Sequence, residues 1–483
     1  MSPSPISASS LYNADLAPVP PERRTWTTWN IAALWIGMAV CIPTYTIASS
    51  LIGAGLTWWQ ALATVFLGNV IVLIPMTLNA HPGTAYGIPF PVLLRASFGT
   101  RGANIAALAR GVVACGWFGI QTWIGGAAVY STAALIFGFD TTTRVPFAGL
   151  GISLGELLAF LSFWAINVFF IARGMSSIKW LEILSAPFLL VIGAALLIWA
   201  VAAADGFGPI FRRGATLEGV ALWSTLGAGL TAMVGFWATL SLNIPDFSRY
   251  ARSQKAQIWG QAIGLPPTMT LYSFIGIVVT SATVVIFGET IWDPVQLITR
   301  FHSPLLAAIA LVALAVATLS TNIAANVVSP ANDFSNLAPR WISFKAGGLI
   351  TAVIGIVMMP WKLLADPSGY VFTWLIGYSA LLGPIAGVMI ADYHVYRRRQ
   401  LSVDDLYRVD GVYRYSRGFS LVALAAMLHG VLPNVPGFLV AIGAVERARV
   451  PEFFLLVYQQ AWFVGFVIAF GLYLLLRKLA PDM

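Results

Sequence analysis

Trp117 and Gln121 stand four residues apart in the apolar segment "GWFGIQTW" at residues 116–123. Residues at this spacing share one face of a helix, so a flat indole would lie beside an amide. An amide without a partner in hydrocarbon costs on the order of several kcal/mol, so Gln121 must bond another helix, water or a ligand. The pair could therefore stack on a planar molecule and hydrogen-bond to its edge.

A second indole, Trp237, follows Gly235 and Phe236. Glycine gives the backbone extra freedom, and we expect the helix to be interrupted at this point. Trp117 and Trp237 together suggest an aromatic clamp.

The most polar run in any apolar segment is "VATLSTNIAANVVSPAND", residues 316–333. At about 100° per residue of a helix, its polar side chains fall on two neighbouring stripes. One stripe has Ala317, Ser320 and Thr321, and the other has Asn322 and Asn326.

The first stripe offers hydroxyl and carbonyl oxygens, which suit a hard monovalent cation. Unwound carbonyls around Gly37 and Val40 could complete the shell. The second stripe offers two amides to a polar, uncharged ligand. Each group also has a structural interpretation. The hydroxyls could bond a carbonyl one turn earlier, and the amides, like Gln121, could join helices.

Composition shows which elements must position these groups. The chain has 483 residues, 58% hydrophobic and 10% charged, with a mean hydropathy of +0.81, which excludes an ordinary soluble protein. Apolar runs of about 20 residues recur throughout, which predicts an all-α polytopic membrane protein. We expect twelve transmembrane helices, at residues 27–52, 58–79, 103–137, 151–172, 177–201, 219–244, 256–288, 303–329, 340–360, 367–395, 418–443 and 454–476.

The net charge of +8 records topology rather than nucleic-acid binding. Most of the 27 Lys and Arg residues fall on one predicted side of the membrane. Basic residues favour the cytoplasmic side, so both termini are expected there, in a multi-pass protein of the cell (inner) membrane. Residues 1–26 are polar and predict a cytoplasmic tail without a cleavable signal peptide. The lipid bilayer is the expected partner, and a monomer is the expected state.

Two interrupted helices at matching positions predict an inverted repeat. Gly37 and Pro43 weaken the first helix, and Gly227, Gly229 and Gly235 the sixth, about 195 residues later. The expected halves are 27–201 and 202–395. A cytoplasmic loop, 396–417, and two further helices, within 418–483, follow, and Arg397, Arg398 and Arg399 in that loop are expected at lipid headgroups.

Charged residues are rare inside the predicted spans. Neither a carboxylate nor a lysine stands mid-helix near the polar cluster, which argues against a charged substrate and a simple proton relay. Exposure to water or headgroups is expected for Glu156, Glu182, Asp246 and Asp392. Arg110 either faces a cytoplasmic cavity or pairs with a carboxylate such as Glu182.

Other classes of protein fit less well. The four histidines lack metal-ligand spacing, and the two cysteines fall in apolar runs, so neither a metal cluster nor a cofactor is expected. An enzyme would need an acid, base or nucleophile at membrane depth. A channel would need a continuous polar pathway rather than one polar cluster.

Several motifs together resemble the nucleobase-cation-symport-1 family, over residues 27–480. They are "TWNIAALWIGMAVCIPTY", "WWQALATVFLGN", "GIPFPVLLRASFG", "GWFGIQTWIGG", "NIPDFSRYAR", "ATLSTNIAANVVSPAND" and "GPIAGVMIADYHVYRRR". The family carries hydantoins, cytosine, uracil or allantoin. The resemblance implies a LeuT-type fold of five plus five helices in inverted repeat, with two extra helices.

The resemblance also implies roles for residues. Trp117 and Trp237 would sandwich a planar heterocycle, while Gln121 and Asn326 would bond its edge, with Asn322 nearby. A sodium site would use the carbonyls of Gly37, Val40 and Ala317 and the hydroxyls of Ser320 and Thr321. Two cavity positions differ from the hydantoin-carrying members. Cys41 replaces a longer amide there, and Phe236 replaces glycine, which argues against hydantoin itself. The motifs of the first and third helices are more similar to those of the allantoin and uracil branch.

The expected function is cation-coupled import of a planar neutral heterocycle by alternating access, with Na⁺ as the favoured ion. Proton coupling, as in some relatives carrying purines or cytosine, stays open. An amino-acid carrier of the same fold is the nearest competitor, but its zwitterion would need a charged partner rather than two indoles.

Overall fold

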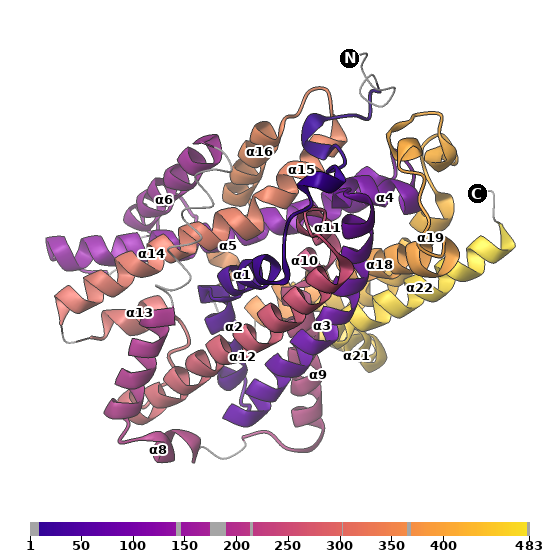
Figure 1. Ribbon diagram of the computed structural model, residues 1–483. Helices are drawn as coiled ribbons and strands as arrows, with labels where there is room; N and C mark the ends of the chain where they lie inside the picture. The colour runs from indigo at the N-terminus through magenta and orange to yellow at the C-terminus, as the bar shows by residue number, and fades with distance from the viewer. Residues whose placement is uncertain are drawn as a thin grey trace.

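The computed structural model describes residues 9–141, 146–173, 190–212, 216–301, 303–364 and 369–480. This part of the chain is almost entirely helical and contains only two isolated β-bridges, Trp26–Ala251 and Ser416–Phe419. The all-α prediction is confirmed. Figure 1 shows long helices crossing one another at the centre, with short helices at both ends of the bundle.

The first half of the chain begins with a helix pair and contains the longest helix. Its helices are α1 (Thr28–Ala39), α2 (Ile42–Gly53), α3 (Trp58–Tyr86), α4 (Phe90–Phe98), α5 (Ala103–Phe137), α6 (Leu154–Arg173), Leu190–Ala203 and α8 (Phe207–Phe211).

The second half repeats the alternation of broken and continuous helices. Its helices are α9 (Gly219–Phe236), α10 (Ala238–Asn243), α11 (Pro245–Ser248), α12 (Gln254–Phe287), α13 (Pro294–Thr299), α14 (Pro304–Asn326), α15 (Val328–Leu337), α16 (Phe344–Val357), α17 (Pro360–Leu363), the π-helix η3 (Gly369–Leu375), α18 (Ile376–Ile390) and the π-helix η4 (Ala391–Tyr396).

The remaining helices are α19 (Leu421–Val431), α20 (Val435–Ala441), α21 (Glu452–Gln459) and α22 (Ala461–Leu479). Nine helices of the described chain are long and apolar enough to cross a membrane, or ten if the bent pair α1 and α2 is one span. Two further predicted spans fall on the shorter apolar helices Leu190–Ala203 and α16. The first part of the predicted span 177–201 lies outside the described residues. The count of twelve transmembrane helices stays a prediction.

The break in the first helix lies at Val40 and Cys41, between the two residues that we expected to cause it. α1 and α2 bend by 57° there. Gly37 remains helical, and Pro43 occupies the first turn of α2. The missing amide of a proline costs no helical hydrogen bond in a first turn, so Pro43 begins a helix instead of interrupting one.

The second break lies at Trp237, as predicted, because α9 ends at Phe236 and α10 begins at Ala238. The prediction that Gly227 and Gly229 also interrupt this helix was wrong, because α9 continues through both residues. A Cβ on Gly229 would lie 2.9 Å from Leu51, so this glycine allows close packing. The eighth helix is also divided, into α14 and α15, with Val327 between them.

α5 packs against both α14 and α16 at the centre of the molecule. At its contact with α16 a Cβ on Gly119 would stand 2.5 Å from the carbonyl oxygen of Gly355. A Cβ on Gly355 would stand 2.7 Å from the ring of Phe118. The two backbones therefore touch, as small residues allow in membrane helices.

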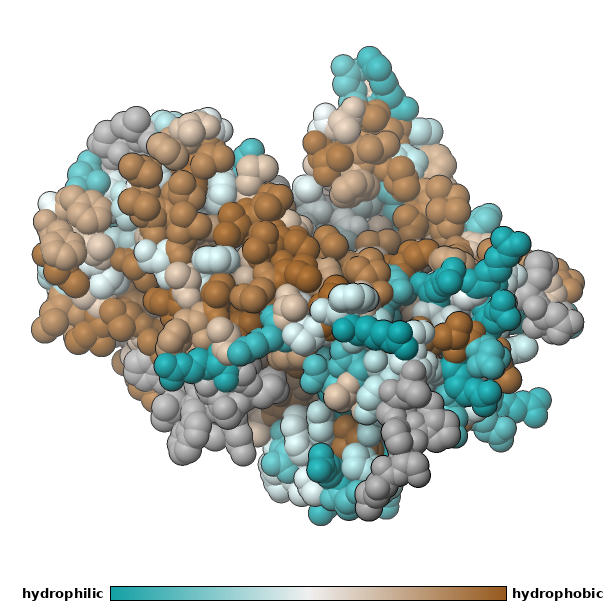
Figure 2. Space-filling view, turned by 90° about the horizontal axis from the view of Figure 1, so that it is seen from above, coloured by the Kyte–Doolittle hydropathy of each residue, from teal (hydrophilic) through white to brown (hydrophobic). Residues whose placement is uncertain are grey.

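Both described ends of the chain pack beside α4. Arg95 of α4 donates from Nη2 to the carbonyl of Leu11, 3.0 Å away. At the other end, Arg477 of α22 donates to Ser420 Oγ, and the amide of Ser420 donates to Phe98 O. Figure 1 places these segments together at its upper right. Figure 2, seen from above, shows hydrophobic side chains over much of that face and hydrophilic ones gathered on its lower and right-hand parts.

The predicted exposure of carboxylates near helix ends was wrong. Asp392 is 0% exposed, Asp246 2% and Glu156 6%, while Glu182 lies outside the described residues. Arg397 does not reach outward to headgroups, because its Nε donates to Asp392 Oδ2 at 2.9 Å. Hydrogen bonds compensate the burial of Asp392, whose carboxylate also accepts from Ser97 and Tyr473, whereas Oδ2 of Asp246 has no partner among the described residues.

Candidate substrate-binding site

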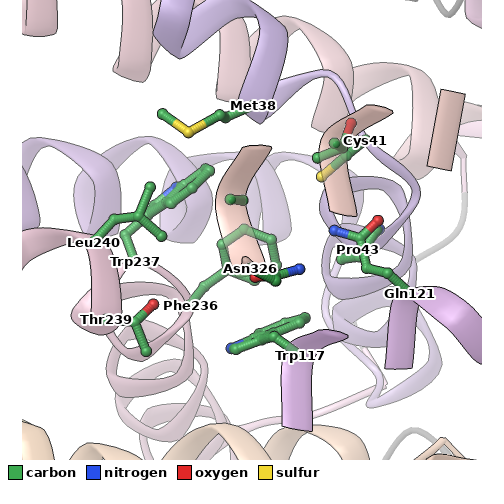
Figure 3. Close-up of a pocket in the computed structure, with 12 residues that line it drawn as sticks. Met38, Cys41, Pro43, Trp117, Gln121, Phe236, Trp237, Thr239, Leu240 and Asn326 are labelled. Carbon is green, nitrogen blue, oxygen red and sulfur yellow. The ribbon is translucent and has the colours of Figure 1, made fainter. Parts of the chain in front are cut away.

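A small cavity lies between the two helix breaks and α5 (Figure 3). It has about 320 Å³ of space between atoms, including the part that opens outward. Its lining residues come from α1, α2, α5, α9, α10 and α14 and from the two breaks. They are Met38, Cys41, Pro43, Trp117, Gln121, Phe236, Trp237, Thr239, Leu240, Thr321, Ala325 and Asn326.

Six of the seven predicted substrate residues therefore line one cavity, although they come from four regions of the sequence. The exception is Asn322, which lies behind Asn326. The breaks at Cys41 and Trp237 bring α1 and α9 to the same depth as the middle of α5. Met38, Thr239 and Leu240 also line the cavity but were not predicted, and their positions next to the breaks were the available signal.

Three aromatic side chains form one wall of the cavity. Phe236 meets Trp117 edge to face, with ring centroids 5.2 Å apart, and meets Trp237 in the same way at 5.0 Å. Trp237 in turn packs edge to face on Trp35, at 5.1 Å. Figure 3 shows the two indoles on different sides of the cavity with Phe236 against both. Each ring offers its own flat apolar face to a planar molecule.

Gln121 and Trp237 bring unused hydrogen-bonding atoms to this wall. Gln121 is 3% exposed, and its Oε1 has no hydrogen-bond partner among the described residues. The same holds for Nε1 of Trp237, whose residue is also 3% exposed. Buried polar atoms in folded proteins almost always have partners, so these two atoms call for a ligand or water.

Asn322 does not line the cavity but hydrogen-bonds to Asn326, which does. Nδ2 of Asn326 donates to Oδ1 of Asn322, 3.0 Å away. Asn322 is 0% exposed and donates to the carbonyl of Phe118 on α5 at 3.2 Å. The structural interpretation is therefore confirmed for Asn322, which joins helices, while Asn326 reaches the cavity and its role in binding stays a prediction.

Cys41 is the N-terminal flanking residue of α2, and its thiol faces the cavity opposite the aromatic wall (Figure 3). Its Sγ lies 3.2 Å from Oγ1 of Thr44, which also contacts Met269 Sδ at 3.4 Å. The thiol is thus a short, weakly polar group at the place where an amide would extend further into the cavity.

The five residues predicted to hold a cation lie on α14 and at the end of α1. Because α1 ends at the break, the carbonyls of Gly37 and Val40 accept no hydrogen bond among the described residues. Such freed carbonyls are the kind that binds Na⁺ in broken helices. Ala317, Ser320 and Thr321 are buried, and α1 contacts α14.

The hydroxyl of Thr321 currently donates to the carbonyl of Ala317 at 3.3 Å. This is the back-bonding that the sequence allowed as an alternative. The oxygen of that hydroxyl still has lone pairs, and Thr321 also lines the substrate cavity. The donor set is entirely neutral oxygen, which fits a monovalent cation.

Arg110 pairs with Asp333, a residue that the sequence analysis did not single out. Its Nη1 lies 3.2 Å from Asp333 Oδ2, and its Nη2 donates to Asn243 Oδ1 at 2.8 Å. Asp333 lies on α15, within the candidate membrane span Pro304–Leu337. The expectation that carboxylates are absent from the spans near the polar cluster is corrected here, although Asp333 does not line the cavity.

Comparisons with known proteins identify the family. A model of permeases for cytosine and purines, uracil, thiamine and allantoin matches residues 18–465. The chain is 45% identical over 464 residues to the purine-uracil permease NCS1 of Arabidopsis thaliana, covering 95% of this chain and 76% of that one. It is 41% identical over 477 residues to the allantoin permease of Bacillus subtilis (strain 168), covering 98% and 94%.

The fold is similar to a solved structure of Mhp1, a nucleobase-cation-symport-1 family transporter in a closed conformation with bromovinylhydantoin bound. The TM-score is 0.80 and the identity 28%, and 98% of each chain is covered. The curated relatives are named as permeases, and the described chain has several membrane-crossing helices. The chain is therefore a multi-pass membrane protein with a LeuT-type fold, and it belongs to the nucleobase-cation-symport-1 family of permeases, as its motifs indicated.

Proposed function

We propose that this protein is a secondary active transporter that imports a planar neutral heterocycle, uracil or allantoin, together with Na⁺. The Gln121 amide, whose Oε1 has no partner in the described part of the chain, lies beside the aromatic wall of the cavity and carries this proposal. A ring that stacks on Trp117 would place its edge at the amide of Gln121. Stacking on an aromatic side chain contributes about 1–3 kcal/mol but hardly distinguishes one heterocycle from another.

Selectivity then depends on the amides. A buried amide that bonds a substrate N–H or carbonyl rejects an analogue without that group, because the amide would be left unpaired. Gln121 and Asn326 are the two amides on the cavity. The relatives named as purine-uracil and allantoin permeases support substrates of this kind.

Na⁺ is the proposed coupling ion. The freed carbonyls of Gly37 and Val40, the carbonyl of Ala317 and the hydroxyls of Ser320 and Thr321 would hold it. This set joins broken α1 to α14, so ion binding would stabilise one relative position of the two helices.

Coupling follows from the position of Thr321, which belongs to the proposed ion site and lines the substrate cavity. Sodium would favour the outward-open arrangement that binds substrate, and alternating access would complete the cycle. By thermodynamic linkage, substrate must raise the affinity for Na⁺ by the same factor. The protein is proposed to work as a monomer in the cell (inner) membrane, with both chain ends in the cytoplasm, as its basic residues favour.

Competition uptake in cells that express the protein tests the proposal. Radiolabelled uracil or allantoin is challenged with hydantoin, cytosine, purines and a neutral amino acid. Saturable, concentrative uptake that other planar heterocycles inhibit is expected. Inhibition by the amino acid instead would replace the proposal with an amino-acid carrier.

Quenching of tryptophan fluorescence in the purified protein tests the ion. Heterocycle affinity should rise with Na⁺ at constant ionic strength. Equal affinity with and without Na⁺, combined with uptake that follows a proton gradient, would replace Na⁺ by H⁺.

A further inference from the structure

Three buried amides form a chain that leads from α6 to the cavity. Asn167 of α6 donates from Nδ2 to the carbonyl of Phe163 at 2.9 Å. Its Oδ1 accepts from Nδ2 of Asn322 at 3.1 Å, and Oδ1 of Asn322 accepts from Nδ2 of Asn326 at 3.0 Å. Asn167 and Asn322 are both 0% exposed, and Asn326 is 5% exposed and lines the cavity.

The direction of this chain follows from its fixed ends. A backbone carbonyl can only accept a hydrogen bond, so Nδ2 of Asn167 must face Phe163 O and its Oδ1 must face Asn322. Nδ2 of Asn322 has a second such anchor, Phe118 O, 3.2 Å away.

A third anchor acts on Asn322. The hydroxyl of Thr122 uses its hydrogen on Phe118 O, at 2.7 Å, so toward Nδ2 of Asn322, at 3.1 Å, it can only accept. Turning the amide of Asn322 over would set its oxygen against three acceptors. Oδ1 of Asn322 therefore faces Asn326, which must supply a hydrogen-bond donor to it.

Asn326 donates from Nδ2. Its Oδ1 therefore lies on the other side of the amide group. That oxygen accepts no hydrogen bond among the described residues. An Asn side chain without such a chain could turn over and offer either atom to a ligand. Here the chain of amides removes that choice.

We infer that Asn167 and Asn322 are positioning residues that hold Asn326 as a hydrogen-bond acceptor toward the substrate. This inference rests on the proposed function and narrows its substrate class. The transported heterocycle must present a ring N–H to Asn326, as a lactam, an imide or a cyclic urea does. A ring whose nitrogens at that edge carry only lone pairs or alkyl groups is rejected.

The test compares ligands that keep the ring and lose the donors. Uracil and hydantoin are the parent probes, with the 1-methyl, 3-methyl and 1,3-dimethyl derivatives of each as competitors. In the wild-type protein the dimethyl derivative should compete at least about 100-fold less well than its parent. One of the two monomethyl derivatives should account for most of this loss and so identify the nitrogen that faces Asn326.

Substitution of Asn322 separates hydrogen bonding from the bulk of the methyl groups. In Asn322→Leu the amide of Asn326 can turn over, and the ratio of parent to dimethyl affinity should shrink by about 10-fold. The bulk of the methyl groups affects both proteins equally and cancels in this comparison.

Asn69→Leu is the matched control. Asn69 is a buried amide that donates to the carbonyl four residues earlier, Val65, at 2.8 Å, as Asn167 does, but it does not line the cavity. Its ratio should equal that of the wild type. Equal affinity of the wild-type protein for parent and dimethyl probes, or an unchanged ratio in Asn322→Leu, would overturn the inference. Absence of binding by every heterocycle would instead overturn the proposed function.

Discussion

Arg110 of α5 and Asp333 of α15 form an ion pair at 3.2 Å in which neither side chain is exposed. Nη2 of the same guanidinium bonds Asn243 of α10, so the pair joins three helices that come from both halves of the chain. A buried charge is tolerated only when it is paired and hydrogen-bonded, so each partner depends on the other.

Removing one partner of this pair should be worse than removing both. Asp333→Leu leaves the guanidinium of Arg110 buried without its carboxylate partner. This should destabilise the protein by about 3–5 kcal/mol. The double variant Arg110→Met with Asp333→Leu should regain most of that loss, because no buried charge is left unpaired. Thermal unfolding in detergent, followed by tryptophan fluorescence, measures both. A double variant as unstable as the sum of the two single variants would contradict this prediction.

Gln121→Ala should abolish uptake without unfolding the protein. The Oε1 atom of Gln121 has no partner among the described residues, so its removal breaks no hydrogen bond of that atom. Uptake should fall by at least about 100-fold, as expected when a buried hydrogen bond to the ligand is lost. The control is Gln254→Ala, whose amide bonds His81 O away from the cavity. Normal uptake by Gln121→Ala would show that the amide has a purely structural role.

The double substitution Ser320→Ala and Thr321→Val should remove the effect of Na⁺ on heterocycle binding. Both hydroxyls belong to the proposed ion site, and valine preserves the volume of threonine. The measurement is tryptophan quenching with and without Na⁺. Thr318→Val is the control, because Thr318 is neither in the proposed ion site nor on the cavity, and its buried hydroxyl is unpartnered in the described chain. A variant that still responds to Na⁺ like the wild type would move the ion site elsewhere.

Phe236→Gly together with Cys41→Gln should broaden selectivity toward hydantoins that carry large substituents. The ring of Phe236 fills the space between the two indoles, and the glycine would open it. The longer amide at position 41 would add a hydrogen-bonding group to the opposite side. Inhibition of uptake by bromovinylhydantoin is expected to become at least about 10-fold stronger. The control is Phe98→Leu, a buried aromatic change in α4 away from the cavity.

The ion pair of Arg397 with Asp392 should stabilise the protein equally across the physiological pH range. Burial lowers the pKa of Arg397, but the Asp392 carboxylate and the nearby tyrosines Tyr415 and Tyr473 outweigh this and hold the pKa above its usual 12.5. A raised pKa gives stability that is complete below the unfolded value and is lost only as the pH rises above it. The difference in melting temperature between wild type and Arg397→Gln should therefore stay constant from about pH 6 to about pH 9. A difference that shrinks toward pH 9 would be inconsistent with this pairing.

The sequence predicted the long helices and the residues of the cavity because both leave a periodic signal. Trp117 and Gln121 share a face through their spacing, and α5 begins and ends where hydropathy placed it, at residues 103 and 137. The break at Trp237 followed from Gly235. These features depend on residues that are close together in the sequence, so they can be predicted from the sequence without knowledge of the fold.

Other features depend on partners that are distant in the sequence. The pairing of Arg110 with Asp333 spans 223 residues, and that of Ser97 with Asp392 spans 295. Nothing in the local pattern of an aspartate near a helix end distinguishes a buried ion pair from a solvated side chain. The amide chain is an intermediate case, because Asn167 is an isolated amide in an apolar run and the reasoning applied to Gln121 would also have selected it.

The contact of Gly119 with Gly355 limits how the molecule can change shape. Two backbones in direct contact cannot slide past one another without collision, whereas longer side chains can change rotamer. Helices α5 and α16 must therefore travel as a single rigid block. In the proposed transport cycle, the relative motion that empties the cavity would then fall on other boundaries of α5, such as the one where Trp117 meets Trp374 and Tyr378.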